Sequence, residues 1–510
     1  MAATSVRPHV RPPVVVALDA GTTGVRALAV DETGAARGWA YREFTQHYPR
    51  PGWVEHDAEE ILAVTRAVLD ELTTVVGRPH AIGITNQRET VVAWDRRTGR
   101  PRHRAIVWQD RRTAAVCDEL RDAGHLALVR RRTGLVLDPY FSGTKAAWLL
   151  ADGNVEADAD LALGTVDSWL LWHLTGGPGT SPATQGTFAT EPSNAGRTML
   201  YDIGERRWSE ELCHLLGVPV SALAEVRPSS GRFGTVADAP PAVAGVPVSG
   251  IAGDQQAALF GQACLDPGMV KATFGTGSFV LVQAGPTCPD PVDGLLTTVG
   301  WELSDGTVAY ALEGAVFATG AAVQWLRDGL GLIERSEEVE ALAASVPDSG
   351  GVVLVPAFTG LGSPWWDPYA RATVVGITRG TTAAHVARAT LEAIAHQTRD
   401  VVDAMTEASG RGAVALRVDG GASLDHLLLE LVAEQVRVPV QRPTVAETTA
   451  LGAAYLAGLA EGVWSSTAEV ADAWHLDVEV TATGEPAAAD AAHATWHRAV
   501  ERSRGWVDDT

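Results

Sequence analysis

The chain has 510 residues, of which 46% are hydrophobic and 20% charged, a composition typical of a globular protein. This length exceeds what one hydrophobic core supports, so we expect two large domains with a ligand cleft between them. The formal net charge of −22 excludes a broad electrostatic attraction to nucleic acid or anionic membrane. An anionic small ligand would therefore need a local group of amides, arginines or a metal ion.

The cysteines and the apolar runs indicate the cellular setting. Four widely spaced cysteines without a CxxC pair favour reduced thiols over a disulfide framework. Residues 1–13 lack the apolar stretch of a signal peptide, and no later apolar run approaches the roughly 18 residues of a membrane span. These features predict a soluble, cytoplasmic protein.

The first half opens with strands around a turn of small residues. Residues 14–18 (VVVAL) form a β-branched apolar run, DAGTTG follows at 19–24, and an extended pattern resumes after it. The segment Asp57–Val76 has apolar residues at helical spacing, and its start, DAEE, is typical of a capping box closed by Glu60. The apolar run AIGITN then predicts a buried strand.

The second half repeats this alternation. It predicts strands at 352–356 and 414–421, a long helix at 383–406, a helix from Ser423, and a buried helix at 449–460 that is too short to span a membrane. Alternating strands and helices indicate an α/β fold with helices flanking the sheets. A second turn of small residues, FGTGS, lies between apolar strands as the first does, so we expect two domains of related design, 1–261 and 262–510.

The two turns carry the first candidate chemistry. A strand that turns through small residues can aim consecutive backbone N–H groups at a phosphate, and Asp19 could bind Mg²⁺ through water. An ordinary hairpin is an equally good interpretation of DAGTTG alone. Two such turns facing each other would grip the β- and γ-phosphates of a nucleotide, and VDGGAS at 418–423 would allow close approach to its base or ribose.

Polar residues at strand ends are the second set of candidates for binding or catalysis. In IAGDQQAALF, Asp254 is first interpreted as a helix cap and second as a catalytic carboxylate, while Gln256 is expected on the helix surface. Arg88 and Glu89 follow a strand directly, so they are either a solvated ion pair or a donor and acceptor set for a polyol. Trp108 and Tyr140 could equally be core aromatics.

Several of these segments belong to longer motifs, namely ALDAGTTGVRA, YPRPGWVEHD, AIGITNQRET, AIVWQDRRTA, TGLVLDPYFSGTK, SGIAGDQQAALFGQ, ALEGAVF, VPAFTGLGSPWWDPYARA and LRVDGGAS. Through them the sequence resembles the FGGY carbohydrate kinases over residues 14 to 462. The resemblance implies two actin-like (ribonuclease H-like) ATPase domains flanking an interdomain cleft. It also implies transfer of the γ-phosphoryl group of ATP, with Mg²⁺, to an alcohol group of glycerol, giving sn-glycerol 3-phosphate and ADP. A homodimer or homotetramer is the expected assembly.

The resemblance also implies roles for individual residues. Asp254 would be the catalytic base, a role compatible with the low pKa expected of an acid at a helix N-terminus, and Asp19 would lie near Mg²⁺. Seven residues would bind the polyol: Arg88, Glu89, Trp108, Tyr140, Asp254, Gln255 and Phe279. Ten would contact the nucleotide: Thr22, Thr23, Gly24, Arg26, Gly275, Thr276, Gly320, Gln324, Gly421 and Asp425.

The chain departs from the family pattern at a few positions. Ala20, Gly24 and Val25 replace a glutamine and a pair of serines around the first turn, and Asp425 replaces an asparagine near the adenine by an acceptor-only anion. We expect these changes to alter nucleotide affinity. Residues 232–245 lack the Gly/Lys-rich stretch with which some members bind fructose 1,6-bisphosphate, and only an isolated Glu485 remains of the patch used for phosphotransferase-system control, so neither inhibition is expected.

Two other functions fit parts of the pattern. A kinase for another small polyol or a ketose shares the same motifs, and NQRET with DPYFSGTK is what favours glycerol over it. A non-catalytic nucleotide-binding switch shares the two-turn architecture, because actin and the heat-shock chaperone ATPases have it too. The carboxylate of Asp254 distinguishes a kinase from such a switch.

Overall fold

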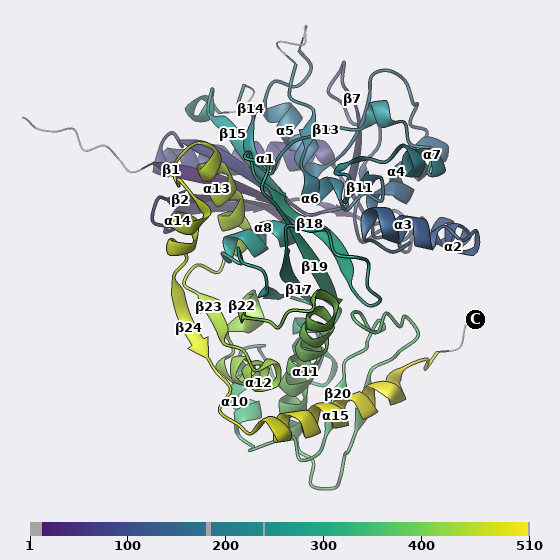
Figure 1. Cartoon of the computed structure of the whole chain (residues 1–510), viewed down its shortest axis with the longest axis vertical. Coiled ribbons are helices and arrows are strands. Elements are labelled where there is room, and N and C mark those ends of the chain that lie inside the picture. Colours follow the sequence, from purple (N-terminus) through teal and green to yellow (C-terminus); the bar gives the residue numbers. More distant parts are fainter. Residues whose placement is uncertain (1–12, 180–184, 238–239, 508–510) are drawn as a thin grey trace, which may run out of the picture.

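Two large sheets organise the chain, whose computed structural model describes residues 13–179, 185–237 and 240–507. The N-terminal residues, including most of the segment examined for a signal peptide, and two residues of the 232–245 loop lie outside this part. Figure 1 shows one lobe built on each sheet, with the early part of the sequence in one lobe and the green middle part in the other.

The first sheet has the strand order β14-β15-β6-β1-β2-β3. β1, β2 and β3 form an antiparallel meander, and β6 and then β15 are added in parallel to β1. The strands are β1 (Val14–Ala20), β2 (Gly24–Asp31), β3 (Ala36–Glu43), β6 (Ala81–Asn86), β14 (Ser230–Thr235) and β15 (Pro247–Gly253). β1 therefore continues through Asp19, which the sequence predicted in the turn.

The second sheet, β18-β19-β17-β16-β22-β23-β24, repeats this design. β16, β17 and β19 form the meander, and β22 and β23 are added in parallel to β16. The strands are β16 (Met269–Phe274), β17 (Ser278–Gly285), β18 (Leu296–Glu302), β19 (Val308–Val316), β22 (Ala415–Asp419), β23 (Val440–Pro443) and β24 (Leu476–Val480). The repeated order and directions confirm the α/β class and the actin-like, ribonuclease H-like design of both lobes.

Smaller sheets and helices surround the first lobe. A third sheet runs β4-β5-β8-β7-β9, and two short pairs are β10-β13 and β11-β12. Their strands are β4 (Gln46–His47), β5 (Glu55–His56), β7 (Val91–Asp95), β8 (Ala105–Ile106), β9 (Leu161–Thr165), β10 (Ala189–Thr190), β11 (Tyr201–Asp202), β12 (Arg207–Trp208) and β13 (Glu225–Val226). The helices are α1 (Ala58–Val76), α2 (Ala114–Asp122), α3 (Leu126–Thr133), α4 (Ser142–Ala151), α5 (Val166–Leu174), α6 (Pro192–Ala195), α7 (Glu210–Leu215) and α8 (Asp254–Gly261), with short turns η1 (Val220–Ala222) and η2 (Pro241–Val243).

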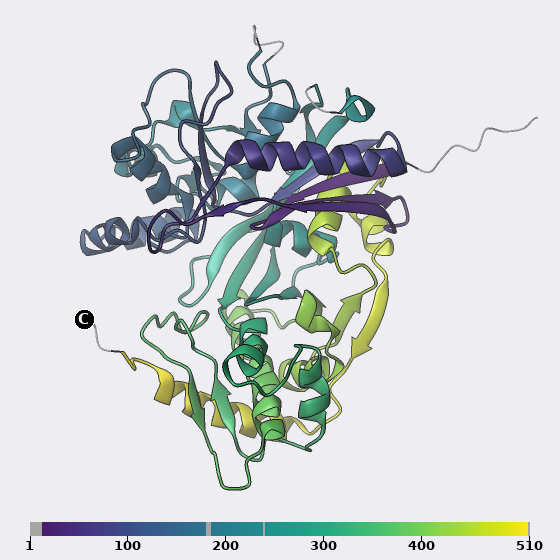
Figure 2. The same ribbon diagram turned by 180° about the vertical axis from the view of Figure 1, so that it is seen from behind.

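Helices of the second lobe pack on its sheet and on one another. Seen from behind in Figure 2, the purple helix α1 covers the purple strands of the first lobe, and green helices fill the second. The remaining elements are α9 (Gly320–Gln324), η3 (Trp325–Gly329), α10 (Glu338–Ala344), β20 (Val353–Val355), β21 (Thr373–Val375), α11 (Ala383–Ser409), η4 (Gly421–Leu424), α12 (His426–Val436), α13 (Thr448–Ala460), α14 (Thr467–Asp472) and α15 (Pro486–Ser503). In the part of the chain that the structure covers, no helix is both long and apolar enough to cross a bilayer.

Helix α13 returns from the second half of the chain to the first lobe. It packs on β15, β6 and β1 of the first sheet and on α8, and Figure 1 shows it beside β1 and β2. Most of its residues are buried, as the all-round apolar pattern at 449–460 predicts. Because this helix completes the first core, the two lobes are not consecutive halves of the chain in space.

Two predictions about helix N-termini differ from the structure, one in the first residue of the helix and one in its capping contacts. The helix expected from Ser423 begins at His426, because η4 occupies Gly421–Leu424 and Asp425 is the N-cap. Asp57 does cap α1, accepting from the backbone N–H groups of Glu59 and Glu60. Glu60, however, does not close a capping box. Its Oε1 accepts from the N–H and hydroxyl of Thr45, which the turn after β3 brings to the start of the helix.

We expect Gly452→Ala to destabilise the fold, because α13 and α8 approach through backbone. A Cβ at Gly452 would lie 1.8 Å from the carbonyl oxygen of Ala257. The overpacking should lower the free energy of unfolding by about 1–3 kcal/mol, measured by urea denaturation. The matched control is Gly412→Ala, where a Cβ meets nothing within 4 Å. Equal stability of both variants would contradict this account of the helix contact.

Candidate active site

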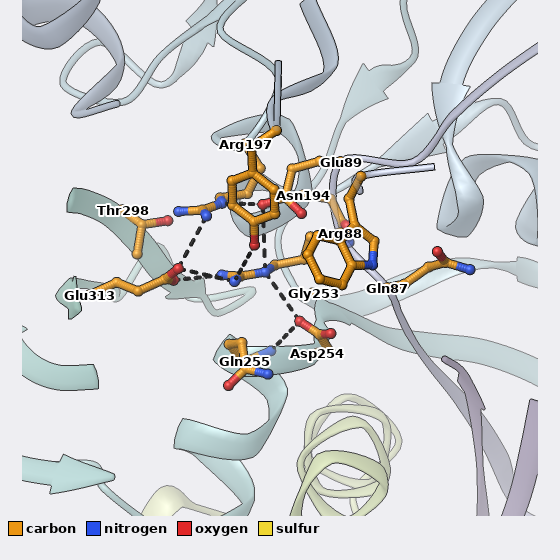
Figure 3. Close-up of polar contacts among 12 residues, drawn as sticks. Gln87, Arg88, Glu89, Asn194, Arg197, Gly253, Asp254, Gln255, Thr298 and Glu313 are labelled. Atoms are coloured by element: carbon orange, nitrogen blue, oxygen red, sulfur yellow. Dashed lines mark hydrogen bonds and ion pairs between the residues drawn. The ribbon is translucent and has the colours of Figure 1, made fainter. Parts of the chain in front are cut away.

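A buried cluster of charges lies where the two sheets meet. Arg88, in the loop after β6, donates from Nη1 and Nη2 to the two carboxylate oxygens of Glu313 on β19, at 2.6 and 3.0 Å. The side chains are only 2% and 1% exposed. This bidentate pair joins the first lobe to the second, and Figure 3 shows it at the centre of the cluster. A buried carboxylate in this geometry needs a fixed cationic partner.

A second arginine completes the cluster. Arg197 follows α6 and donates from Nε to Glu89 at 2.6 Å and from Nη2 to Glu313 at 3.1 Å. Although burial opposes it, Arg197 and Arg88 together lower the pKa of Glu313 to about 2. Burial raises the pKa of Glu89, and the same two arginines offset part of that rise. Two guanidinium groups and two carboxylates therefore neutralise one another in the interior.

Asp254 is the accessible acid next to this cluster. It is the first residue of α8, and its Oδ1 lies 3.1 Å from Arg88 Nε and accepts from the backbone N–H of Gln255 at 2.7 Å. Its side chain is 30% exposed, whereas that of Arg88 is 2% exposed. The N-cap of α8 is Gly253, not Asp254. The predicted capping role of Asp254 is therefore limited to its hydrogen bond with the Gln255 N–H. A ligand can therefore reach its carboxylate.

The expectation of a low pKa for Asp254 is wrong. Removal from bulk water raises the pKa of the carboxyl, and Arg88 and the Gln255 N–H oppose that rise only in part. The helix N-terminus favours the anion, but the desolvation of the carboxylate dominates. The result is an acid that binds a proton more readily than an exposed aspartate.

The two glutamines after Asp254 have different roles. Gln255 accepts from the Nζ of Lys271 on β16 at 2.5 Å. Gln256, expected on the helix surface, is instead fully buried. Its Oε1 accepts from Arg88 at 3.1 Å and its amide nitrogen donates to Thr298 at 3.0 Å. The first turn of α8 packs into the lobe junction, which a local sequence pattern does not reveal.

Aromatic side chains border the same cluster. Tyr140 receives a long hydrogen bond of 3.4 Å from Arg88, and its ring stands edge-on to Trp108 at 5.5 Å. Trp108 donates from Nε1 to the hydroxyl of Thr22 at 3.0 Å, which links this group to the first turn. Phe279 on β17 lies 5.9 Å from the guanidinium of Arg88. Of the other six residues predicted to bind the polyol, four lie against Arg88, and Trp108 and Gln255 are linked to it through Tyr140 and Asp254.

The first turn is held by its neighbours. The carbonyl of Thr22 accepts from Gln46, and the hydroxyl of Thr23 lies 3.4 Å from that of Tyr41. Gly24 has no room for the serine side chain expected from the family, because a Cβ would lie 2.5 Å from the carbonyl oxygen of Arg42. Arg26, predicted to contact the nucleotide, pairs in this structure with Glu447 at the start of α13. The other two departures near this turn, Ala20 and Val25, are fully buried in the hydrophobic core of the first lobe.

The second turn lies in a separate cavity of about 390 Å³ in the second lobe. The Gly320 N–H donates to the carbonyl of Gly275, which fixes the start of α9 on the turn. Six of the ten residues predicted to contact a nucleotide line this cavity: Gly275, Thr276, Gly320, Gln324, Gly421 and Asp425. The remaining four, on the first turn and β2, lie in the other lobe.

One strand, β16, connects the cavity to the charge cluster. Its Lys271 contacts Gln255, and its last residue, Phe274, lines the cavity beside Gly275. Three residues of strand span about 10 Å. The strand therefore links the wall of the cavity to the first turn of α8, next to Asp254.

Asp425 is an unusual acid in the wall of the cavity. Its Oδ1 caps α12 by accepting from the Leu428 N–H at 2.9 Å, and its Oδ2 is buried without a hydrogen-bond partner. Burial, with a smaller effect of Glu340, raises its pKa to about 6. An acceptor-only side chain in this position faces any ligand that occupies the cavity.

Four members of the site escaped the sequence analysis: Arg197, Gln256, Lys271 and Glu313. Lys271 and Glu313 lie within the apolar strand patterns VKATF and ALEGAV, and a charge inside a buried strand is a signal that such a residue is paired. Arg197 has no comparable signal, because it follows a short helix in a stretch without clear periodicity.

Comparisons with known proteins identify the class of enzyme. The model of the FGGY family of carbohydrate kinases, N-terminal domain, matches residues 14–261, and that of its C-terminal domain matches residues 270–461. The chain belongs to this family and is an ATP-dependent kinase that acts on an alcohol group.

Individual relatives match the chain over nearly its whole length. The chain is 56% identical to the glycerol kinase of Trichlorobacter lovleyi over 97% of its own length and 99% of that protein. It is 54% identical to the glycerol kinase of Dechloromonas aromatica over 97% and 98% of the two chains. The crystal structure of Plasmodium falciparum glycerol kinase with ADP matches with a TM-score of 0.90 at 32% identity, covering 96% of this chain and 98% of that one.

We expect Glu313→Gln to be strongly destabilising, since it leaves the two buried guanidinium groups of Arg88 and Arg197 to share the single buried carboxylate of Glu89. Breaking a buried ion pair costs about 3–5 kcal/mol, which urea denaturation would measure. The control is Glu302→Gln at the end of the neighbouring strand, whose partner Arg206 is half-exposed, with an expected loss below about 1 kcal/mol. Similar losses for both variants would show that the cluster does not stabilise the lobe junction.

Proposed function

We propose that this enzyme transfers the γ-phosphoryl group of ATP to a terminal hydroxyl of glycerol, giving sn-glycerol 3-phosphate and ADP. The observation that carries the proposal is the accessible carboxylate of Asp254 next to a buried set of polyol-type donors and acceptors. The similarity to glycerol kinases over nearly the whole chain supports the same substrate.

Recognition of glycerol follows from the polar groups around Arg88. A small triol has little apolar area, so selectivity depends on hydrogen bonds that a wrong substrate leaves unmade. Arg88, Glu89 and Tyr140 offer donors and acceptors from the first lobe. Gln255 adds an amide, and the rings of Trp108 and Phe279 border the carbon skeleton. The 3.4 Å contact between Arg88 and Tyr140 is long enough to be replaced by a substrate hydroxyl.

Asp254 acts as the general base in this proposal. Its Oδ1 is held by Arg88 and the Gln255 N–H, and Oδ2 is the oxygen that we assign to the substrate proton. The hydroxyl oxygen attacks the γ-phosphorus as its proton passes to Asp254, and the β-phosphate leaves with ADP. The pKa raised by burial favours proton acceptance, and the guanidinium of Arg88 opposes part of that rise.

The cavity in the second lobe is the proposed site for ATP, with its adenine near Gly421 and Asp425. The amides around Gly275 and those of the first turn, Thr22 to Gly24, would hold the phosphates from opposite lobes. We accordingly assign polyol and phosphate binding to residues 1–261 and nucleotide binding to residues 262–510, with α13 returning to complete the first core.

Asp19 fits a role as the residue that holds Mg²⁺ through water. Burial and the neighbouring Asp254 raise its pKa to about 7, and Arg26 lowers it only in part. Two carboxylates that repel each other suit a divalent cation, and an oxygen donor set suits magnesium. When bound with the nucleotide, the ion supplies positive charge against the phosphate oxygens.

A coupled assay of ADP formation at fixed MgATP, with a panel of glycerol, erythritol, xylitol and xylulose, tests the substrate. We expect glycerol to have the largest kcat/KM and the product to be sn-glycerol 3-phosphate. A larger kcat/KM for xylulose or erythritol would overturn the assignment to glycerol. ATP binding without phosphorylation of any alcohol would indicate a nucleotide-binding switch.

Asp254→Asn should lower kcat by about 10²- to 10⁴-fold, because the amide cannot accept the substrate proton. ATP binding, measured by isothermal titration calorimetry, should be unchanged, since the cavity lies in the second lobe. Asp305→Asn, at an exposed turn between β18 and β19, is the matched control with normal kcat. A normal kcat for Asp254→Asn would assign proton transfer to another group.

Asp425→Asn should improve nucleotide binding, because it removes an unpaired buried anion yet keeps an N-capping side chain. We expect the KM for ATP to fall by about 3- to 10-fold at pH 8, equivalent to about 1 kcal/mol. Since the pKa of Asp425 is about 6, the wild-type carboxyl is neutral below that pH and the difference should shrink at pH 5.5.

Glu337→Gln, an exposed acid in the same wall, controls for a general charge effect and should leave the KM unchanged. An equal improvement in both variants, or one that does not depend on pH, would show that the position of the Asp425 carboxylate does not limit affinity.

A further inference from the structure

A second cluster of titratable side chains lies between α11 and α15, in the wall of the second lobe away from the proposed glycerol site. Asp400 belongs to α11, and His493 and His497 belong to α15. In Figure 1, α15 runs along the outer edge of that lobe, across the end of α11. Nothing in the proposed reaction uses these residues.

The two imidazoles converge on a single oxygen. Nε2 of His493 and Nε2 of His497 each lie 2.7 Å from Oδ1 of Asp400. The two histidines are four residues apart on one helix, the spacing that places two imidazoles on one face where both can bind the same ion. The three potential ligand atoms all lie within 4.8 Å of one another.

The surroundings hold these ligand atoms in place. Trp496 donates from Nε1 to the other oxygen of Asp400 at 2.7 Å, which fixes the orientation of the carboxylate. The ring of His396, one helical turn before Asp400, stacks on His493 and Trp496 at 5.8 and 5.5 Å. The Nδ1 of His396 is buried without a hydrogen-bond partner. Support of this kind around ligand side chains is typical of metal sites in proteins.

A plain hydrogen-bond network is the alternative, in which both histidines donate to Asp400. That network explains why the helices are joined. It does not explain why one carboxylate oxygen is shared by two imidazoles while the other is reserved for an indole, nor why a third imidazole with an unsatisfied nitrogen lies beside them. Convergence of two nitrogens and one oxygen is what a bound cation would explain.

We propose that Asp400, His493 and His497 form a binding site for one divalent transition-metal ion of the Zn²⁺ type. Two imidazoles and a carboxylate are a donor set that such ions prefer, whereas Mg²⁺ and Ca²⁺ prefer oxygen alone. Water completes the coordination on the side of His497, whose side chain is 45% exposed. Each imidazole would bind the ion through Nε2, which must carry no proton when the metal is bound.

The site needs a small opening of the cluster. Metal–ligand bonds of about 2.0–2.1 Å in a tetrahedron place ligand atoms about 3.3 Å apart, which is more than the present 2.7 Å. Rotation of the half-exposed His497 ring can lengthen its own distance to Asp400. The distance from His493 must lengthen by about 0.6 Å as well, which takes a small shift of the buried His493 ring or the Asp400 carboxylate. Neighbouring charges balance, because Arg399 pairs with Asp403 and Asp490, and Arg437 also pairs with Asp490.

A metal at this position would clamp α15 to α11. α11 also carries Leu391, which lines the proposed ATP cavity, and α15 packs on α12, which Asp425 caps. The expected contribution is therefore to the stability of the second lobe rather than to the chemistry at Asp254.

The test uses the full-length, tag-free protein, stripped with a chelator and titrated with Zn²⁺ by calorimetry. We expect one equivalent to bind, with the same stoichiometry by elemental analysis and an increase in melting temperature. Co²⁺ in place of Zn²⁺ should give the visible absorption of a tetrahedral nitrogen and oxygen site. His497→Gln should weaken Zn²⁺ binding by about 10- to 100-fold or more.

His426→Gln is the matched control, because His426 is an exposed helical histidine paired only with an acid four residues away, and it should bind Zn²⁺ as the wild type does. A wild-type protein with no saturable Zn²⁺ binding would overturn the proposal. So would equal binding by wild type and a folded His497→Gln, as judged by circular dichroism. If His497→Gln fails to fold, the Co²⁺ spectrum of the wild type decides, and its absence overturns the site.

Discussion

The bidentate ion pair between Arg88 and Glu313 is the constraint on which the rest of the site depends. Arg88 comes from the first sheet and Glu313 from the second, so burial of the pair requires both lobes to meet in one arrangement. Desolvated charges are costly unless their partners are held exactly where the hydrogen bonds form. Arg197 donates to both Glu89 and Glu313, so each buried carboxylate of the cluster is bonded to a guanidinium.

The same arginine sets the properties of Asp254. Burial raises the pKa of this carboxyl, and the guanidinium 3.1 Å away lowers it in part by favouring the anion. The catalytic carboxylate of the proposed reaction is thus balanced between desolvation and one fixed cation. Since Glu313 holds that cation from the opposite lobe, the reactivity of Asp254 is coupled to the packing of the two sheets.

The duplicated design explains how both substrates are positioned. Each lobe has a hairpin turn of small residues. Neighbouring carbonyl oxygens leave no space for a Cβ at Gly24 or Gly320, so only glycine fits at these two positions. β16 carries the second turn at one end and Lys271 near its middle, so this one strand links the cavity of the second lobe to the first turn of α8. The return of α13 to the first core fastens the arrangement.

Sequence alone determined the elements and the short-range motifs. Periodicity predicted α1, α11 and α13, and the turn residues predicted both hairpins. Asp254 and Arg88 were candidates because each follows a strand directly, and the resemblance to the FGGY carbohydrate kinases supplied their expected roles. Only the tertiary structure decided which partners these residues have. Glu313 reaches Arg88 from 225 positions away in the chain, and Arg197 reaches Glu89 from 108 positions away. Gln256 turns inward at the lobe junction, and desolvation reverses the expected pKa of Asp254. Periodicity reports one element's exposed and buried faces, whereas pairing and dielectric environment arise only when distant elements pack together.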